Sequence, residues 1–154
     1  MNATTETLAY ERTLSIAAAP ETVWEFFVDP EKLKRWMGID AELEPRAGGV
    51  FRDEVIPGHT AAGEFVEVDR PRRLVFTWGW QGEDKVPPGS STIEVVLTPE
   101  DDGTSVRFVH RDLPDANAVE SHAHGWNHYL DRLELAAAGR DLGADPWVTE
   151  TPAM

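Results

Sequence analysis

The chain has 154 residues, of which 41% are hydrophobic and 27% charged, as in a globular protein with one sizeable core. Its 14 basic and 28 acidic residues give a net charge of −14, which repels phosphate groups, so we expect neither a nucleic-acid nor a membrane partner. It has no cysteine, no apolar run long enough to span a bilayer and no signal-peptide pattern at its start. We therefore predict a cytoplasmic protein without disulfides or thiolate metal sites.

Two short helices are predicted directly after a first strand. Residues 8–16 alternate in the period of a half-buried strand. Pro20 then stands at the first position of a strongly apolar helix. Asp29 caps a second helix, which also opens on a proline and buries Leu33.

The middle of the chain keeps a period of two, which predicts strand after strand. Short turns rich in glycine and proline separate these strands, so we expect an antiparallel meander. The polar segment 81–90, with its run of two prolines and a glycine, is predicted to be a mobile loop. The expected strands are 41–44, 50–56, 63–69, 73–80, 92–98 and 104–110.

Residues 117–139 predict a long amphipathic helix, with Asn117 as its cap, Glu120 completing a capping box and Gly139 at its end. A tail at 140–154 follows, which Trp147 is expected to hold in place. The apolar side chains recur at steps of three and four and form one face. They are Val119, Ala123, Trp126, Leu130, Leu133 and Ala137.

These elements predict an α+β fold in which a curved antiparallel sheet of six to seven strands wraps around the C-terminal helix. The two short helices follow the first strand. We expect a single domain over residues 1–154, with its core at about 8–139.

An ordered set of short motifs resembles a known family, the one named after the activator of the ninety-kilodalton heat-shock protein ATPase. This family belongs to the START-like (SRPBCC) helix-grip superfamily, with the major pollen allergens and polyketide cyclases. The resemblance covers about residues 8–139 and implies a cavity between the sheet and the long helix, but not one activity. The motifs stand at residues 18–24, 29–33, 36–38, 48–52, 63–65, 71–78, 103–104 and 125–126.

Inward-facing aromatic and apolar side chains are candidates for the lining of that cavity. The alternative is that they fill a solid core. His110 continues the apolar face of its strand, so its ring is a candidate hydrogen-bonding partner for a ligand. The candidate ligand-binding residues are Trp36, Phe51, Phe65, Phe76, Trp78, Val106, Phe108, His110 and Trp126.

Three histidines on the long helix raise the question of a metal site. His124 and His128 are four residues apart, a spacing that can place two imidazoles on one ion. The metalloprotease pattern is absent, so we interpret them, with His122, as polar residues of an exposed helix face. We predict no metal and no cofactor.

Carboxylates on two neighbouring predicted strands are the remaining candidates for chemistry. Alternation places Asp53 on the face of Phe51, and Glu67 on the face of Phe65, so one member of each pair could reach the cavity rim. The alternative is a solvated sheet face, which would also hold the remaining carboxylates, Glu54 and Glu64. No catalytic triad, phosphate loop or dinucleotide fingerprint is present, so no catalytic residue is predicted.

The leading hypothesis is therefore a protein that binds a small apolar or aromatic molecule between sheet and helix. A second hypothesis is a chaperone regulator or other interaction domain, with a homodimer or protein partner, although we expect a lone domain without the extra N-terminal domain of the eukaryotic co-chaperone. A third is a cyclase- or hydrolase-like enzyme that uses His110 and a rim carboxylate.

Overall fold

The computed structural model describes residues 8–150 as one sheet with four helices. The helices are α1 (Pro20–Val28), α2 (Pro30–Leu33), α3 (Ala116–Ala137) and α4 (Pro146–Thr149). The strands are β1 (Tyr10–Ile16), β2 (Asp40–Leu43), β3 (Val50–Ile56), β4 (His59–Asp69), β5 (Arg73–Trp78), β6 (Ser91–Glu100) and β7 (Gly103–Arg111). The predicted order of elements is confirmed, and α4 is an addition within the predicted tail.

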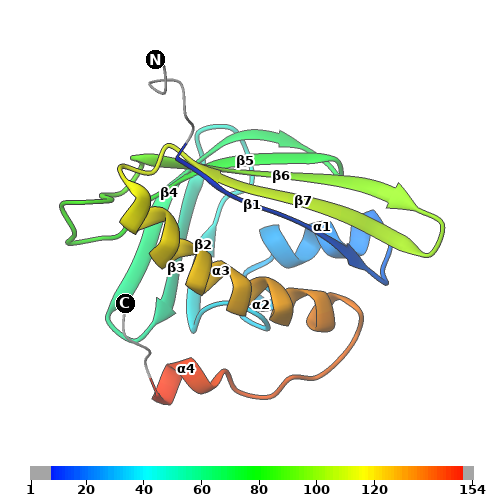
Figure 1. Cartoon of the computed structure of the whole chain (residues 1–154). Coiled ribbons are helices and arrows are strands. Elements are labelled where there is room, and N and C mark those ends of the chain that lie inside the picture. The colour runs from blue at the N-terminus through cyan, green and yellow to red at the C-terminus, as the bar shows by residue number, and fades with distance from the viewer. Residues whose placement is uncertain (1–7, 151–154) are drawn as a thin grey trace.

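All seven strands form one antiparallel sheet in the order β1-β7-β6-β5-β4-β3-β2. The meander runs from β2 to β7, and β1 then closes its far edge by pairing with β7. The sheet curves over α3, as Figure 1 shows. The predicted α+β helix-grip architecture is confirmed.

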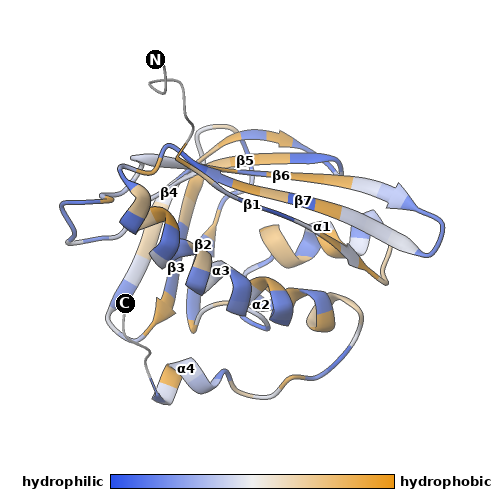
Figure 2. Ribbon diagram, viewed as in Figure 1, coloured by the Kyte–Doolittle hydropathy of each residue, from blue (hydrophilic) through white to orange (hydrophobic). Residues whose placement is uncertain are grey.

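Helix α3 packs its apolar face against the concave side of the sheet. Leu130 and Leu133 are fully buried, and Trp126 is 3% exposed, as the periodicity predicted. Figure 2 shows hydrophobic positions along α3 alternating with hydrophilic ones that face outward. At the outer side of α3, Tyr10 donates a hydrogen bond from its hydroxyl to Asn127 Oδ1 at 2.6 Å, which ties β1 to the helix.

The predicted cap of α3 is wrong by two residues. The helix begins at Ala116, and Asp115 is its N-cap, with Oδ1 accepting a hydrogen bond from the Ala118 amide at 2.8 Å. Asn117 therefore lies in the first turn and is exposed. An ionised carboxylate also complements the positive end of the helix dipole, which an amide cannot do.

Strand β4 departs from regular pairing, and this changes which carboxylate faces inward. The register shifts between Phe65 and Glu67, so Phe65 is buried while Glu67 is exposed and pairs with Arg73. The expectation that both lie on one face is wrong, because a bulge adds a residue to one strand. Gly63 lies just before this bulge and has a separate role: a Cβ there would lie 2.1 Å from the Thr77 carbonyl oxygen, so the residue permits close approach of β5.

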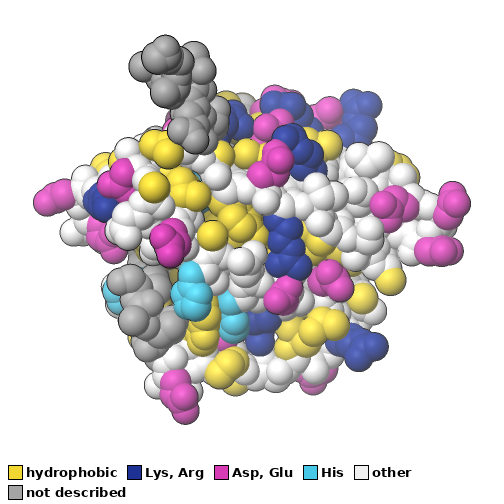
Figure 3. Space-filling model, in the orientation of Figure 1, with side chains coloured by type: hydrophobic (Ala, Val, Ile, Leu, Met, Phe, Trp, Pro, Cys, Tyr) yellow, Lys and Arg dark blue, Asp and Glu magenta, His cyan; other side chains and the backbone are white. Residues whose placement is uncertain are grey.

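Charged side chains cover the outside of the molecule. On the face shown in Figure 3, acidic groups are spread over the surface and basic groups lie among them. Several form ion pairs, such as Arg12 with Asp131 at 2.7 Å and Arg70 with Glu21 at 2.9 Å. Such exposed pairs contribute little to stability, and their main effect is on solubility.

Candidate functional site

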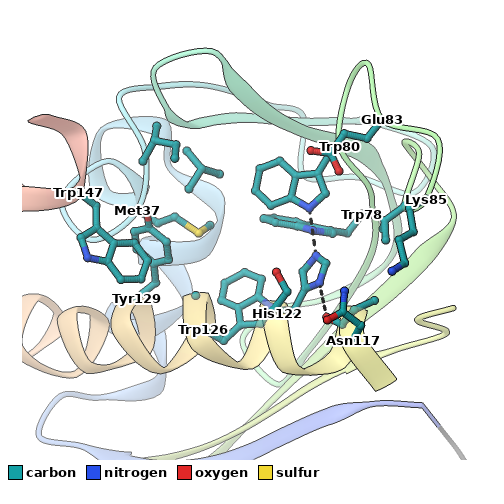
Figure 4. A pocket seen from close by; sticks show the side chains of 16 residues that line it. Met37, Trp78, Trp80, Glu83, Lys85, Asn117, His122, Trp126, Tyr129 and Trp147 are labelled. Carbon is teal, nitrogen blue, oxygen red and sulfur yellow. Dashed lines mark hydrogen bonds between the residues drawn. The ribbon is translucent and has the colours of Figure 1, made fainter. Parts of the chain in front are cut away.

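A pocket of about 230 Å³ opens between the sheet and α3. Val55 and Ile56 of β3 and Trp78 of β5 form its sheet side. Trp80, Glu83, Lys85 and Val86 line one end, and Met37 and Trp147 of α4 line the other (Figure 4). Figure 4 shows the side chains converging on a common space from these different elements. The lining on α3 consists of Asn117, Ala118, Ser121, His122, Gly125, Trp126 and Tyr129.

Five tryptophan and tyrosine side chains line the pocket. The Trp78 ring meets Trp80 edge-on, with centroids 5.3 Å apart, and tilts against Trp126 at 5.1 Å. Tyr129 and Trp147 line the opposite end, with centroids 5.5 Å apart. Five large aromatic side chains thus present ring faces or edges to one small space, an arrangement suited to a flat apolar molecule.

His122 holds Trp80 in place and is not free to act on a ligand. Its Nδ1 donates to the Ala118 carbonyl oxygen at 2.8 Å, because a carbonyl can only accept. Its Nε2 therefore carries the lone pair that accepts from Trp80 Nε1 at 3.0 Å. Burial lowers the pKa of His122, so the neutral ring that this arrangement requires is also the favoured one.

His110 belongs to a buried hydrogen-bond chain behind the pocket. Trp126 Nε1 donates to His110 Nδ1 at 3.0 Å, which leaves His110 Nε2 protonated and donating to Ser91 Oγ at 2.8 Å. The Ser91 hydroxyl donates in turn to the Trp78 carbonyl at 2.7 Å. Burial lowers the pKa of His110 well below its usual range, so the ring is neutral, and both of its nitrogens are occupied within the protein.

The tail forms one wall of the pocket through contacts with α3. Trp147 stacks on the His128 ring, with centroids 3.7 Å apart and planes at 9°. Asp145 Oδ1 accepts from His128 Nε2 at 2.9 Å and from the Trp147 amide at 3.0 Å, so it caps α4 while it holds the helix to α3. The prediction that Trp147 orders the tail agrees with this packing.

Asp53 is a buried carboxyl close to the Met37 end of the pocket. Its side chain is 0% exposed, and neither oxygen has a hydrogen-bond partner among residues 8–150. A Cβ at Gly38, where φ is +98°, would lie 2.0 Å from Asp53 Oδ1, so only glycine fits there. Burial raises the pKa of Asp53 well above its usual range.

Residues 17–138 match the family described as activator of Hsp90 ATPase homolog 1-like protein. The chain belongs to this family. The structure of an AHSA1-like protein from Rhizobium etli, 44% identical, superposes with a TM-score of 0.74 over 92% of this chain and 89% of that one. CalU16 from Micromonospora echinospora is 27% identical over 92% of this chain and 80% of that chain, with a TM-score of 0.70.

An Hsp90 activator from Plasmodium falciparum shares the fold at 24% identity, with a TM-score of 0.69 over 83% of this chain and 94% of that one. A comparison with functionally curated proteins gave no match. In the part of this AHSA1-like chain that the structure describes, no helix is long and apolar enough to cross a membrane.

Of the nine candidate ligand-binding residues of this family member, the pocket lining contains Trp78 and Trp126. The other seven lie outside it and are at most 3% exposed. They pack on one another: Phe51 stacks on Phe76 at 4.3 Å and meets Phe65 edge-on at 5.9 Å. The residues outside the lining are Trp36, Phe51, Phe65, Phe76, Val106, Phe108 and His110.

Several lining residues were not among the candidates. Trp80 belongs to the aromatic pattern of the predicted strand 73–80. Trp147 was expected to hold the tail in place, but the sequence did not indicate which part of the fold it contacts. Met37 and Tyr129 had no sequence feature that separated them from core residues. His122 was expected on an exposed face, which is wrong, because the turn of α3 carries its ring against Trp80.

The other two helical histidines contact the tail. His124 stacks on Trp147 at 5.2 Å, on the same side of α3 as His128. Trp147 thus lies against the two rings that the sequence spacing placed four residues apart. Within residues 8–150, no group of three or more His, Cys, Asp or Glu side chains is arranged to hold a metal ion.

Proposed function

We propose that this protein binds a small apolar or aromatic molecule in the pocket between the sheet and α3, and that it acts in the cytoplasm as a single domain. The observation that carries the proposal is a pocket of about 230 Å³ with five aromatic side chains in its lining. An engineered apolar cavity of about 150 Å³ binds benzene, so this space suits a molecule of one or two rings.

Binding is favoured over catalysis by the state of the histidines. His110 and His122 use both ring nitrogens in contacts within the protein, so neither offers a free base to a ligand. Asp53 and Glu67, the two carboxylates expected near the rim, are not in the lining. The enzyme hypothesis therefore lacks the pair of groups on which it was built.

Gly125 allows a direct test, because it lies in α3 and faces the open space. A Cβ built there meets no atom within 4 Å. Gly125→Phe should therefore fill the pocket without displacing the core. Gly125→Ala is the matched control: it adds one methyl group, leaves most of the space and favours the helix by about 1 kcal/mol.

The measurement is a titration with a neutral naphthalene fluorophore, followed by its emission and by quenching of the pocket tryptophans. We expect saturable binding near micromolar Kd in the wild type and in Gly125→Ala, about −8 kcal/mol. Gly125→Phe should weaken binding at least about tenfold, with an unchanged near-ultraviolet circular dichroism spectrum. Equal affinity in Gly125→Phe, or binding only to partly unfolded protein, would rule out this pocket as the binding site.

A further inference from the structure

The aromatic pocket has buried carboxyl groups at one end, and this bears on the charge of its ligand. Tyr129 lines the pocket, and the charges of Asp145 and Asp53 add to burial in raising its pKa. Asp145 accepts a hydrogen bond from the amide of the lining residue Trp147 at 3.0 Å, and Asp53 Oδ1 lies against Gly38, next to the lining residue Met37. Two carboxyl groups therefore lie directly behind the lining at the end formed by Met37, Tyr129 and Trp147, whereas Glu83 belongs to the lining at the opposite end.

These carboxyl groups have unused hydrogen-bonding capacity. Asp145 is 9% exposed, and although Oδ1 is occupied by His128 and the Trp147 amide, Oδ2 is buried without a partner among residues 8–150. Both oxygens of Asp53 are likewise buried without a hydrogen-bond partner among residues 8–150. A buried, unpaired carboxyl oxygen is costly unless a cation or a donor approaches it.

Two basic side chains around the pocket, Lys85 and Arg132, are already engaged. Lys85 stands at the opposite edge of the pocket and pairs with Asp115 at 3.1 Å. Arg132 donates to the Trp36 carbonyl at 3.2 Å and to the Arg35 carbonyl at 3.3 Å, away from the lining. Neither offers a free cation to the carboxyl groups beside Tyr129.

We propose that the preferred ligand of this pocket is an aromatic organic cation, with its ammonium group held at the Tyr129–Trp147 end beside Asp145 and Asp53. This inference rests on the proposed function and names its ligand class. Tryptophan and tyrosine faces attract cations through the ring quadrupole, and tryptophan does so most strongly. Burial inside the pocket makes this attraction stronger than at an exposed site.

A bound cation should also change the protonation of Asp53. The groups that act on its charge are Asp40 of β2, Arg52 and Glu54 of β3, and Tyr129 of α3. Without a cation, burial favours the protonated form of the carboxyl, whereas a cation at the Tyr129 end favours release of that proton to solvent and formation of the carboxylate.

Two ligands of the same shape and size separate charge from apolar contact. Phenyltrimethylammonium and tert-butylbenzene differ in a single atom, nitrogen in place of carbon, and therefore in charge alone. Each is titrated against wild-type protein containing the neutral naphthalene fluorophore, and its Kd is taken from displacement of the fluorophore. We expect the cation to bind at least about tenfold more tightly.

The variants assign that preference to the two carboxyl groups. Asp53→Asn should reduce the ratio of the two affinities several-fold while leaving tert-butylbenzene affinity nearly unchanged. Asp145→Asn should reduce the ratio as well, but it should also weaken the binding of both molecules, because Asp145 holds α4 to α3. Asp101→Asn is the matched control, because it removes one carboxylate at the exposed β6–β7 turn and should leave the ratio as in the wild type.

Equal or tighter binding of tert-butylbenzene overturns the cation inference and leaves the proposed function standing. An equal loss of the ratio in Asp101→Asn overturns it too, since the preference would then come from net charge. If neither molecule displaces the fluorophore while the fluorophore itself fails to bind, the proposed function falls as well.

Discussion

At the scale of single residues, Trp126 connects the pocket with the buried hydrogen bonds of His110 and Ser91. One side of its ring lines the pocket, and the other packs on Phe108 with centroids 4.5 Å apart. Its N–H is the donor to His110 Nδ1, which would otherwise be a buried acceptor without a partner. The indole thus contributes both apolar burial and a hydrogen bond that a smaller side chain cannot replace.

Replacement of Trp126 should therefore lower the stability of the folded protein. We expect Trp126→Ala to lower the free energy of unfolding by ~3–5 kcal/mol, the range for a buried large aromatic. Trp126→Phe should lose about 1–3 kcal/mol, since it keeps most apolar contact but leaves His110 without its donor. Urea denaturation measures both; a loss below about 1 kcal/mol for Trp126→Ala would contradict the assigned packing.

Asp53 should make stability depend on pH. Its pKa is raised in the folded protein, so the folded state holds a proton that the unfolded chain releases above about pH 4. The contribution of Asp53 is therefore fully present below that pH and is lost as the pH rises toward the folded pKa. The Tm of the wild type should fall relative to that of Asp53→Asn over this window.

Thermal unfolding of the two proteins from pH 4 to pH 8 measures this difference, and their shared groups cancel in the comparison. Asp101→Asn serves as the control, because its carboxylate is exposed in the turn and carries no burial cost. Parallel curves for wild type and Asp53→Asn would show that the buried carboxyl does not retain its proton.

At the scale of elements, α4 is a short helix held on α3 through Trp147 and the capping residue Asp145. It has four residues, none of them fully buried, and its attachment depends on the His128–Trp147 stack and the Asp145 side chain. A four-residue helix is not stable by itself in water. Its place therefore depends on these tertiary contacts, and with it one wall of the pocket.

Trp147→Ala should open this end of the pocket. We expect faster dissociation of the naphthalene fluorophore and weaker binding, because a pocket wall and the stack on His128 are both lost. The Tm should change little, since Trp147 is only partly buried at the edge of the core. Stopped-flow displacement measures the rate, with Thr149→Ala as an exposed control; an unchanged rate would mean that α4 does not enclose the ligand.

At the scale of the whole molecule, the net charge of −14 acts against the compact state. Repulsion between surface carboxylates is screened by salt, with a Debye length of about 10 Å at 0.1 M. We expect the Tm to rise as sodium chloride is added at pH 7. Scanning calorimetry over a salt series measures this, with a neutral osmolyte as a control for nonspecific stabilisation; a falling Tm would mean that ion pairs outweigh the repulsion.

Much of the architecture can be predicted from the sequence, because it depends on local periodicity. The apolar steps of 117–139 indicated the buried face of α3 at Leu130 and Leu133, and the period of two indicated the meander. Asp29 was predicted as the cap of a second helix, and it accepts from the Glu31 amide at 2.9 Å. These features depend only on residues that are close to one another in the sequence.

The pocket was decided by the tertiary structure alone. Alternation tells which side chains face inward, but not whether the inner space is filled: Phe51 and Phe76 fill it by stacking, whereas the absent side chain of Gly125 leaves it open. His122 meets Trp80 across 42 residues of sequence. Contacts of this kind depend on how the sheet curves over the helix, which no local sequence pattern encodes. The periods of strands and helices, in contrast, follow from the backbone geometry within each segment.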